Sequence, residues 1–224
     1  MRLQEFPVPG GLWSFSCRKR VDDAYGMNIH SVMGVRDPDI TRKLIMDAAL
    51  RMFAHRGFHG TNVPDLAKDA AVGAGSIYRH FEDKEGLVNA VYSHWKEHFR
   101  QSILEPAPDL RLGFRDQFLE LWARLWRFYR KNPDAMVFLD VHAHGDYLSK
   151  ASRSISDSFE EELSIWIRAG QQEKALGDGK PQELISMAYG AFIGLVKRDQ
   201  NHGKLAAGIA EESGHLVWKM LGPG

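Results

Sequence analysis

The stretch from Thr61 to Leu87 constrains the fold of this chain more than any other part of the sequence. It contains two short helical patterns joined by a tight turn of small residues, and a third helix opens at Asp83. This order is typical of a helix-turn-helix unit, whose short second helix enters the major groove of DNA. We therefore predict a small helical DNA-binding domain with its recognition helix at about residues 74–81.

The same stretch resembles the tetracycline-repressor family of bacterial regulators, which shares the run A-x-x-A-G-V-S-x-G-x-x-Y-x-H-F-x-x-K-E-x-L. The residues in register with that run are Ala67, Ala70, Val72, Gly75, Tyr78, His80, Phe81, Lys84, Glu85 and Leu87. Ala71 stands in place of the turn glycine and Gly73 in place of the capping serine. A positive φ at Ala71 would cost about 1 kcal/mol relative to glycine, and glycine is an acceptable N-cap.

Eight side chains or backbone positions are candidates for DNA contact. They are Thr61, Asn62, Gly75, Ser76, Tyr78, Arg79, His80 and Lys84. Ser76, Arg79 and His80 are the candidate readers of base edges, because Arg can donate two hydrogen bonds to guanine and Ser can serve several bases. The resemblance implies that Tyr78 and Lys84 hold phosphates. The alternative for Tyr78 and His80 is that they only pack the small domain.

Composition limits the classes of function. Lys+Arg and Asp+Glu both total 29, so any DNA affinity must come from the local placement of charge and from backbone amides. The single cysteine, Cys17, excludes an internal disulfide and a Cys-based zinc site. No apolar run approaches the roughly 20 residues of a membrane span, and the N-terminus lacks the apolar core of a signal peptide. We predict a cytoplasmic protein that uses no cofactor.

The chain divides into three parts. We predict that residues 1–36 form a flexible tail, because Pro7 and Pro9 break any helix there. The alternative is that Arg18, Lys19 and Arg20 form a basic arm that reaches DNA. We expect residues 1–35 to be dispensable, and a start at Met33 to suffice. Residues 37–83 form the predicted helix-turn-helix domain, and residues 84–224 the predicted ligand-binding and dimerisation domain, with one helix connecting the two.

Beyond a proline-rich stretch at residues 105–108, every segment has a helical period. The expected helices span about 110–131, 133–143, 149–175, 181–199 and 204–221. The first is apolar on most sides, so we expect it to be buried except for one wet edge that includes Arg124. The resemblance implies an all-α fold of about nine helices.

Aromatic residues of this second part could line a ligand cavity, and ordinary core packing is the alternative for each of them. The candidates are Phe118, Trp122, Trp126, Phe138, His142, Trp166, Tyr189 and Phe192. The residues Asp140, His142, His144 and Asp146 are also candidate metal ligands. On a helix, the two pairs that are four residues apart, Asp140/His144 and His142/Asp146, lie on different faces, whereas a metal needs its ligand pairs on one face. We therefore predict no metal site, and expect one of these four to point into the cavity.

Gly190 and Gly194, four residues apart, leave a flat groove on one helix face that lets another helix approach closely. The candidate dimer residues are Met187, Gly190, Gly194, Leu216, Val217 and Trp218. The groove could instead receive the last helix of the same chain. The resemblance favours a homodimer, because members of that family dimerise through their last two long helices as a four-helix bundle.

No G-x-S-x-G, P-loop or G-x-G-x-x-G motif is present, so the sequence offers no catalytic residue. We predict a transcriptional repressor that a small apolar or aromatic ligand releases from a palindromic operator in double-stranded DNA. Two alternatives stay open: an all-helical enzyme of the lyase or deaminase type, and a DNA-architectural protein without a ligand.

Overall fold

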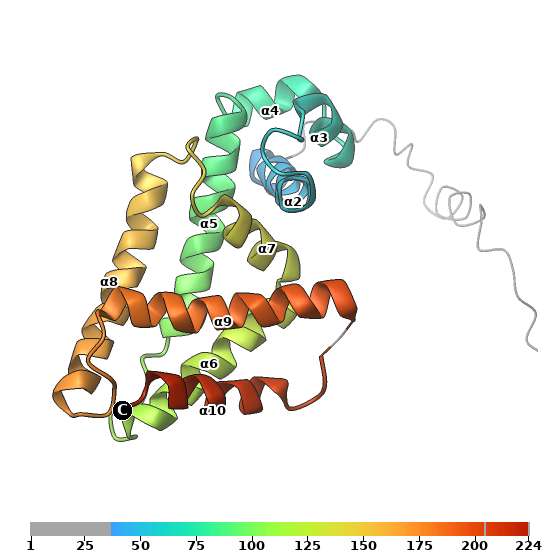
Figure 1. The fold of residues 1–224 in the computed structure, drawn as a ribbon. Helices are drawn as coiled ribbons and strands as arrows, with labels where there is room; N and C mark the ends of the chain where they lie inside the picture. The colour runs from blue at the N-terminus through green and yellow to red at the C-terminus, as the bar shows by residue number, and fades with distance from the viewer. Residues whose placement is uncertain (1–36, 204, 224) are drawn as a thin grey trace, which may run out of the picture. The chain divides into compact units, whose positions relative to one another are not determined.

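The computed structural model describes residues 37–203 and 205–223, and all regular elements in those ranges are α-helices. The tail predicted for residues 1–36 lies outside the described residues. The helices are α2 (Pro38–Arg56), α3 (Val63–Asp69), α4 (Ala74–His80), α5 (Lys84–Leu104), α6 (Phe114–Lys131), α7 (Pro133–His142), α8 (Lys150–Gln172), α9 (Pro181–His202) and α10 (Ile209–Leu221) (Figure 1). The all-α prediction is confirmed.

Helix α2 packs against the helix-turn-helix that follows it. It ends at Gly57, whose φ of 68° is a left-handed conformation that suits glycine. Two ion pairs join α2 to α3: Arg51 to Asp69 at 2.8 Å and Arg56 to Asp65 at 3.4 Å. Both pairs are well exposed, so they orient the two helices more than they stabilise them.

The α3–α4 turn has the backbone that the sequence predicts. Ala71 has a φ of 52°, and Gly73 is the N-cap of α4 with an extended backbone. Ala71 thus occupies the left-handed position that glycine fills in the family run. From its sequence Thr61 is also a candidate N-cap of α3, but the structure shows that Asn62 is the cap, because its side chain accepts the hydrogen bond from the Asp65 amide.

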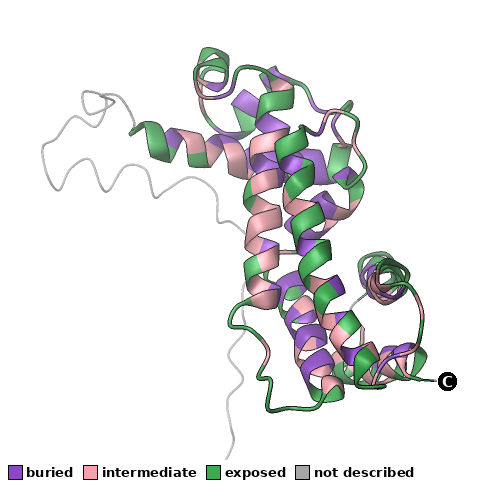
Figure 2. Ribbon diagram, turned by 90° about the vertical axis from the view of Figure 1, so that its left-hand side faces the viewer, coloured by how far each residue is buried: buried purple, intermediate pink, exposed green. Residues whose placement is uncertain are grey.

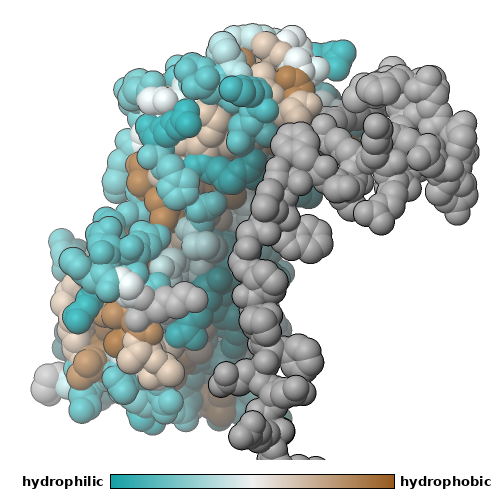
Figure 3. Space-filling view, turned by 90° about the vertical axis from the view of Figure 1, so that its right-hand side faces the viewer, coloured by the Kyte–Doolittle hydropathy of each residue, from teal (hydrophilic) through white to brown (hydrophobic). Residues whose placement is uncertain are grey.

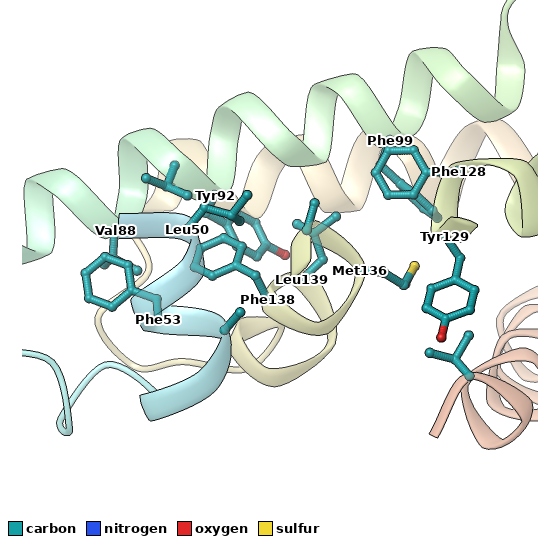
Figure 4. Packing of buried hydrophobic residues seen from close by; sticks show 14 of the residues in the cluster. Leu50, Phe53, Val88, Tyr92, Phe99, Phe128, Tyr129, Met136, Phe138 and Leu139 are labelled. Atoms are coloured by element: carbon teal, nitrogen blue, oxygen red, sulfur yellow. The ribbon is translucent and has the colours of Figure 1, made fainter. Parts of the chain in front are cut away.

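Helix α5 connects the helix-turn-helix to the rest of the chain. It begins after Asp83, whose carboxylate accepts from the Gly86 amide at 2.7 Å. Figure 4 shows the buried cluster beside its first half, where Phe53 of α2 and Phe138 of α7 lie close to Tyr92 of α5. Phe138 is 6.3 Å from each of the other two rings. One core therefore runs through α2, α5 and α7.

Residues Thr41–Gly224 cluster as one compact unit, so the division after residue 83 stays a prediction. Helix α5 packs on α6, α7 and α8, while α10 packs on α6 and α9. Most of the long helices are buried along one side and exposed along the other (Figure 2). This pattern agrees with the helical period from which they were predicted.

Two helices of the C-terminal part begin later than the sequence suggested. Helix α6 begins at Phe114 rather than near residue 110, because Gly113 is extended and serves as its N-cap, and Leu110 is exposed. Helix α10 begins at Ile209 rather than 204, because Gly208 has a φ of 96°. In each case a glycine sets the start.

The prediction that Arg124 lies on the solvent-exposed edge of α6 is wrong, because its side chain is only 7% exposed. Its Nη1 donates to the carbonyls of Ile103 at 2.9 Å and Pro106 at 2.6 Å, and its Nε donates to Glu120 at 3.0 Å. The guanidinium therefore satisfies the carbonyls at the end of α5, where helical partners are lacking. The i, i+3 and i+4 period identified the stripe of charges, but it could not show that the end of α5 covers it.

Candidate DNA-binding surface and ligand cavity

The recognition helix α4 is held by two buried residues and exposes most of the rest. Ile77 is fully buried and Phe81 is 5% exposed. Tyr78 and Arg79 are exposed, and Tyr78 keeps 55% of its surface despite its large ring. An exposed aromatic ring with a hydroxyl on a short helix is suited to contact a sugar-phosphate backbone.

Arg79 and Ser76 form one polar group on this helix. Arg79 Nη2 donates to Ser76 Oγ at 3.3 Å, and the neighbouring Gly75 has no described atom within 4 Å of the position that a Cβ would take. The contact is long and exposed, so DNA could replace it at little cost. This arrangement leaves the guanidinium available to a base edge.

His80 is half-buried, and its carbonyl is fixed by a residue that the sequence analysis did not identify. Arg42 of α2 donates from Nη1 to the His80 carbonyl at 3.3 Å, and its guanidinium lies 4.5 Å from the centre of the Phe81 ring. Arg42 thus holds the C-terminal end of α4. No motif signals it, because the contact joins residues far apart in the chain.

Thr61 and Lys84 are placed differently from the expectation. Thr61 is 1% exposed, and its hydroxyl donates to the Gly57 carbonyl at 2.9 Å, so its side chain is not presented to DNA. Lys84 Nζ donates to the carbonyls of Phe58 at 3.0 Å and Thr61 at 3.1 Å, and lies 4.2 Å from the centre of the Phe58 ring. Its ammonium is therefore engaged inside the domain, where it ties the start of α5 to the α2–α3 loop. Asn62 is exposed, but its side chain is the α3 cap.

A cavity of about 610 Å³ lies between α5, α6, α8 and α9. Its size falls in the range of about 300–1,000 Å³ that small-molecule sites have. Four of the predicted ligand residues line it, namely Phe118, Trp122, Trp166 and Tyr189. Trp122 Nε1 donates to Ser213 Oγ at 3.0 Å and Trp166 Nε1 to Gln117 Oε1 at 2.8 Å, so both indoles have fixed orientations.

The other four predicted ligand residues do not line this cavity. Trp126 and Phe192 pack edge to face with ring centres 5.4 Å apart, and are 2% and 0% exposed. Phe138 is fully buried between Phe53 and Tyr92. For these three residues the alternative of core packing describes their place better.

His142 is fully buried and joins α7 to α2 instead of entering the cavity. Its Nε2 lies 3.1 Å from the Phe53 carbonyl, which can only accept, so Nε2 carries the proton and Nδ1 accepts from the Tyr147 hydroxyl. Burial lowers the pKa of His142. Tyr147 in turn stacks on Phe58 with ring centres 4.1 Å apart. This neutral histidine therefore links the α7–α8 loop to the loop after α2.

No group of three or more His, Cys, Asp or Glu side chains in the described part of the chain is placed to hold a metal ion. Of the four residues considered for a metal, only His144 lines the cavity. Asp140 is instead paired with Lys197 at 3.0 Å.

The sequence analysis missed the α5 wall of the cavity and, apart from Trp166, the α8 wall. Tyr92, Lys96, Phe99 and Ile103 line it from α5 at the helical spacing of three and four. The Tyr92 hydroxyl is within 2.9 Å of Ser156 Oγ on α8, and burial raises the pKa of Tyr92. The i, i+4, i+7 and i+11 pattern of these four residues could have been found in the sequence, but it is also the pattern of an ordinary buried face.

The predicted dimer residues fall into two groups. Met187 and Leu216 are 47% and 67% exposed, and no described atom lies within 4 Å of a Cβ added at Gly190 or Gly194. The last helix of the same chain therefore does not fill the groove of α9. Figure 3 shows apolar side chains gathered on one face at the height that α9 and α10 occupy in Figure 1.

Val217 and Trp218 serve the chain's own core. Val217 is 6% exposed, and Trp218 packs on Phe118 with ring centres 5.6 Å apart. The exposed apolar surface of α10 is instead formed by Leu216 and by Met220, which is 44% exposed.

Among the described helices, none combines the length and the apolar character that a membrane span requires.

The sequence models of two families match the chain over the described helices. Bacterial regulatory proteins of the tetR family match residues 45–91, and the tetracyclin repressor-like C-terminal domain matches residues 94–215. The first covers the helix-turn-helix, and the second covers most of the cavity lining and all of α9. Together they account for both halves of the predicted architecture.

Individual relatives agree with the family models. An uncharacterized HTH-type transcriptional regulator of Haemophilus influenzae is 32% identical over 89 residues, which is 40% of this chain and 47% of that protein. The AcrR regulator of Shigella flexneri is 42% identical over 52 residues, or 23% of this chain and 24% of AcrR. The matched regions thus span less than half of these curated relatives.

A crystal structure of a TetR family transcription regulator from Marinobacter aquaeolei VT8 is similar over a larger part of the chain. It superposes with a TM-score of 0.71 at 21% identity, covering 82% of this chain and 96% of that one. At this identity the likeness shows the shared fold. With both family models in register on the two parts of the chain, this protein belongs to the tetR family of bacterial transcriptional regulators, which bind DNA through a helix-turn-helix.

Proposed function

We propose that this chain is a homodimeric repressor that binds a palindromic operator and leaves it when a small, largely apolar ligand enters the cavity between α5, α6, α8 and α9. Three parts of the molecule are involved: the recognition helix α4, the cavity, and helix α5, which contacts the helix-turn-helix at one end and lines the cavity further along. Each part has separate support.

The observation that carries the proposal is the double role of α5. Its first residue, Lys84, holds the carbonyls of Phe58 and Thr61 beside the helix-turn-helix. Two and three turns later, Tyr92 and Lys96 line the cavity. A ligand that favours a different position of α5 therefore also favours a different position of α4. Ligand and operator then weaken each other's binding by the same factor.

The contact between His142 and Phe53 supports a second connection. The α7–α8 loop places Ala143 and His144 in the cavity lining, next to the buried His142 that bonds the Phe53 carbonyl of α2. A movement of this loop on ligand binding would strain a buried hydrogen bond to α2. Such bonds are costly to leave unmade, so a ligand that moves this loop would also act on α2.

The exposed stripe of α9 supports a homodimer. Met187, Gly190 and Gly194 recur at helical spacing and are exposed, and Leu216 and Met220 extend the apolar surface onto α10. Glycine in a helix interior costs about 1 kcal/mol relative to alanine, and close approach of a second copy would offset that cost. A two-fold dimer would place two recognition helices for a pseudo-palindromic site.

An enzyme and an architectural protein were the alternatives. Membership of a regulator family favours regulation over catalysis, and a cavity that reaches α5 favours a ligand-responsive protein over an architectural one. The proposed location is the cytoplasm, where the operator would be found.

Selection of DNA fragments from a random pool tests the DNA part of the proposal. The recovered site should be a pseudo-palindrome whose half-sites lie about one helical turn or slightly more apart. A recovered site without two-fold symmetry would contradict it. Addition of apolar or aromatic compounds to the complex should then dissociate the DNA at concentrations that quench tryptophan emission, because Trp122 and Trp166 line the cavity.

The variant Gly194→Leu tests the dimer. A Cβ added there has no described atom within 4 Å, and the position is exposed, so the protomer should fold while the partner helix would be displaced. We expect a monomer with weakened operator binding although no residue of α4 has changed. Ser158→Leu, which places a leucine on the exposed face of α8, is the matched control and should stay dimeric. A dimeric Gly194→Leu protein with intact operator affinity would place the interface elsewhere.

A further inference from the structure

Lys96 is the least expected residue in the cavity wall. It lies near the middle of α5, and its Nζ is 5.6 Å from the centre of the Phe99 ring and 5.4 Å from that of Phe159. It donates no hydrogen bond to any described residue and forms no ion pair with one. A Lys ammonium has three donors, so the two ring faces leave it incompletely satisfied.

The Lys96 side chain is half-buried, with its ammonium facing two aromatic rings. Burial lowers the pKa of its ammonium to about 8, although the negative charge of Glu160 opposes that shift. At pH 7 the group is still mostly protonated. The cavity therefore holds a half-buried positive charge that has no direct ion pair or hydrogen bond with a described residue, and an anion that contacts the ammonium directly would supply one.

The other charged groups of the cavity lining are exposed to solvent, and one of them also donates hydrogen bonds to backbone carbonyls. Asp157 and Glu160 are exposed, so water screens them. Arg153 is exposed too, and its donors are engaged by the carbonyls of Leu148, Gly145 and Asp146. Within the described lining, only Lys96 combines a net charge with an apolar setting.

We propose that the cavity takes an organic acid, with one carboxylate on the Lys96 ammonium and an apolar body among the aromatic side chains of α6 and α8. This inference rests on the proposed ligand cavity and specifies the class of its ligand. A single half-buried positive charge suits a monoanion better than a phosphate group with nearly two negative charges. Phe118, Trp122 and Trp166 provide flat apolar walls for the body.

Matched pairs of acid and amide test the assignment, because they share shape and differ in charge. 2-Naphthoic acid with 2-naphthamide, and decanoic acid with decanamide, should be titrated at pH 7 into the DNA-free dimer by calorimetry. We expect at least one acid to bind 10-fold or more tightly than its amide. Lys96→Gln should abolish that preference and Lys96→Arg should retain it. Lys131→Gln, at an exposed lysine of α6, is the control and should behave as the unchanged protein.

The thermal melting of each variant keeps the test decisive. Lys96→Gln removes an incompletely satisfied charge, so the melting temperature should stay the same or rise; if that variant fails to fold, Lys96→Met serves in its place. Acids that bind no better than amides, including no binding by either, would overturn the proposal. So would a preference that persists without Lys96.

Operator release, followed by fluorescence anisotropy of labelled DNA, separates this inference from the proposed function. Release by amides and acids alike would overturn the carboxylate assignment and leave the repressor intact. Acids that bind through Lys96 without releasing DNA would support the assignment and contradict ligand-released repression.

Discussion

Alanine should have opposite effects on stability at Gly214 of α10 and Gly194 of α9, although each glycine lies in the interior of its helix. At Gly214 an added Cβ would lie 2.8 Å from Cδ1 of Trp122 and 3.1 Å from Cδ2 of Leu119. Trp122 cannot move aside easily, because it is 2% exposed and its indole donates to Ser213. At Gly194 no described atom lies within 4 Å of the added Cβ.

The magnitudes follow from two terms. Alanine gains about 1 kcal/mol over glycine in a helix interior. Overpacking a buried contact costs about 1–3 kcal/mol. The difference is a net loss of roughly 0–2 kcal/mol for Gly214→Ala, centred on about 1 kcal/mol, which corresponds to a fall in Tm of about 2–4 °C for a chain of this size. Gly194→Ala should gain about 1 kcal/mol in the protomer, because only the first term applies.

Urea unfolding followed by tryptophan emission measures both changes. The experiment should be repeated over a range of protein concentrations, with sedimentation velocity to report the fraction of dimer, since association adds to the apparent stability. At concentrations where the protomer dominates, the two variants should lie on opposite sides of the unchanged protein. Equal shifts, or a stabilised Gly214→Ala, would refute the argument that α10 approaches α6 too closely for a side chain at that position.

Three further predictions concern the helix-turn-helix and a buried contact between α7 and α2. Arg79→Ala should cost about 1–3 kcal/mol of operator affinity and relax the preference at one base position; uniform weakening on all sequences in a binding selection would contradict base reading. Lys84→Met should lower the free energy of unfolding by about 1 kcal/mol while leaving the salt dependence of DNA binding unchanged, whereas a slope reduced by about 1 would show a phosphate contact. The pKa of His142 is lower in the folded state than its ordinary 6.5, so the unfolded chain takes up a proton first and stability should fall as pH drops below about 6.5. His142→Phe should flatten that dependence in chemical unfolding at pH 5–7, and an unchanged slope would contradict it.

Local sequence determined most of the helices and the helix-turn-helix. Asp83 caps α5 where the sequence predicts that a helix opens, and Gly57 ends α2, because capping and a left-handed backbone depend on the residue itself and its near neighbours. Ala71 and Gly73 adopt the turn and cap conformations inferred from the family run. Ile77 and Phe81 are buried, as the period of the recognition helix indicates. These features need no knowledge of distant segments.

Tertiary structure decided which side chains share a site. Trp122 and Trp126 lie one turn apart on α6 with the same chemistry, yet only Trp122 lines the cavity, whereas Trp126 packs between Tyr129 and Phe192 in the core. Lys84 donates to loop carbonyls, and His142 bonds α2, through contacts between residues far apart in the chain. Periodicity assigns a residue to a helix face, but the helices that pack on that face determine whether it meets a cavity, a core or solvent.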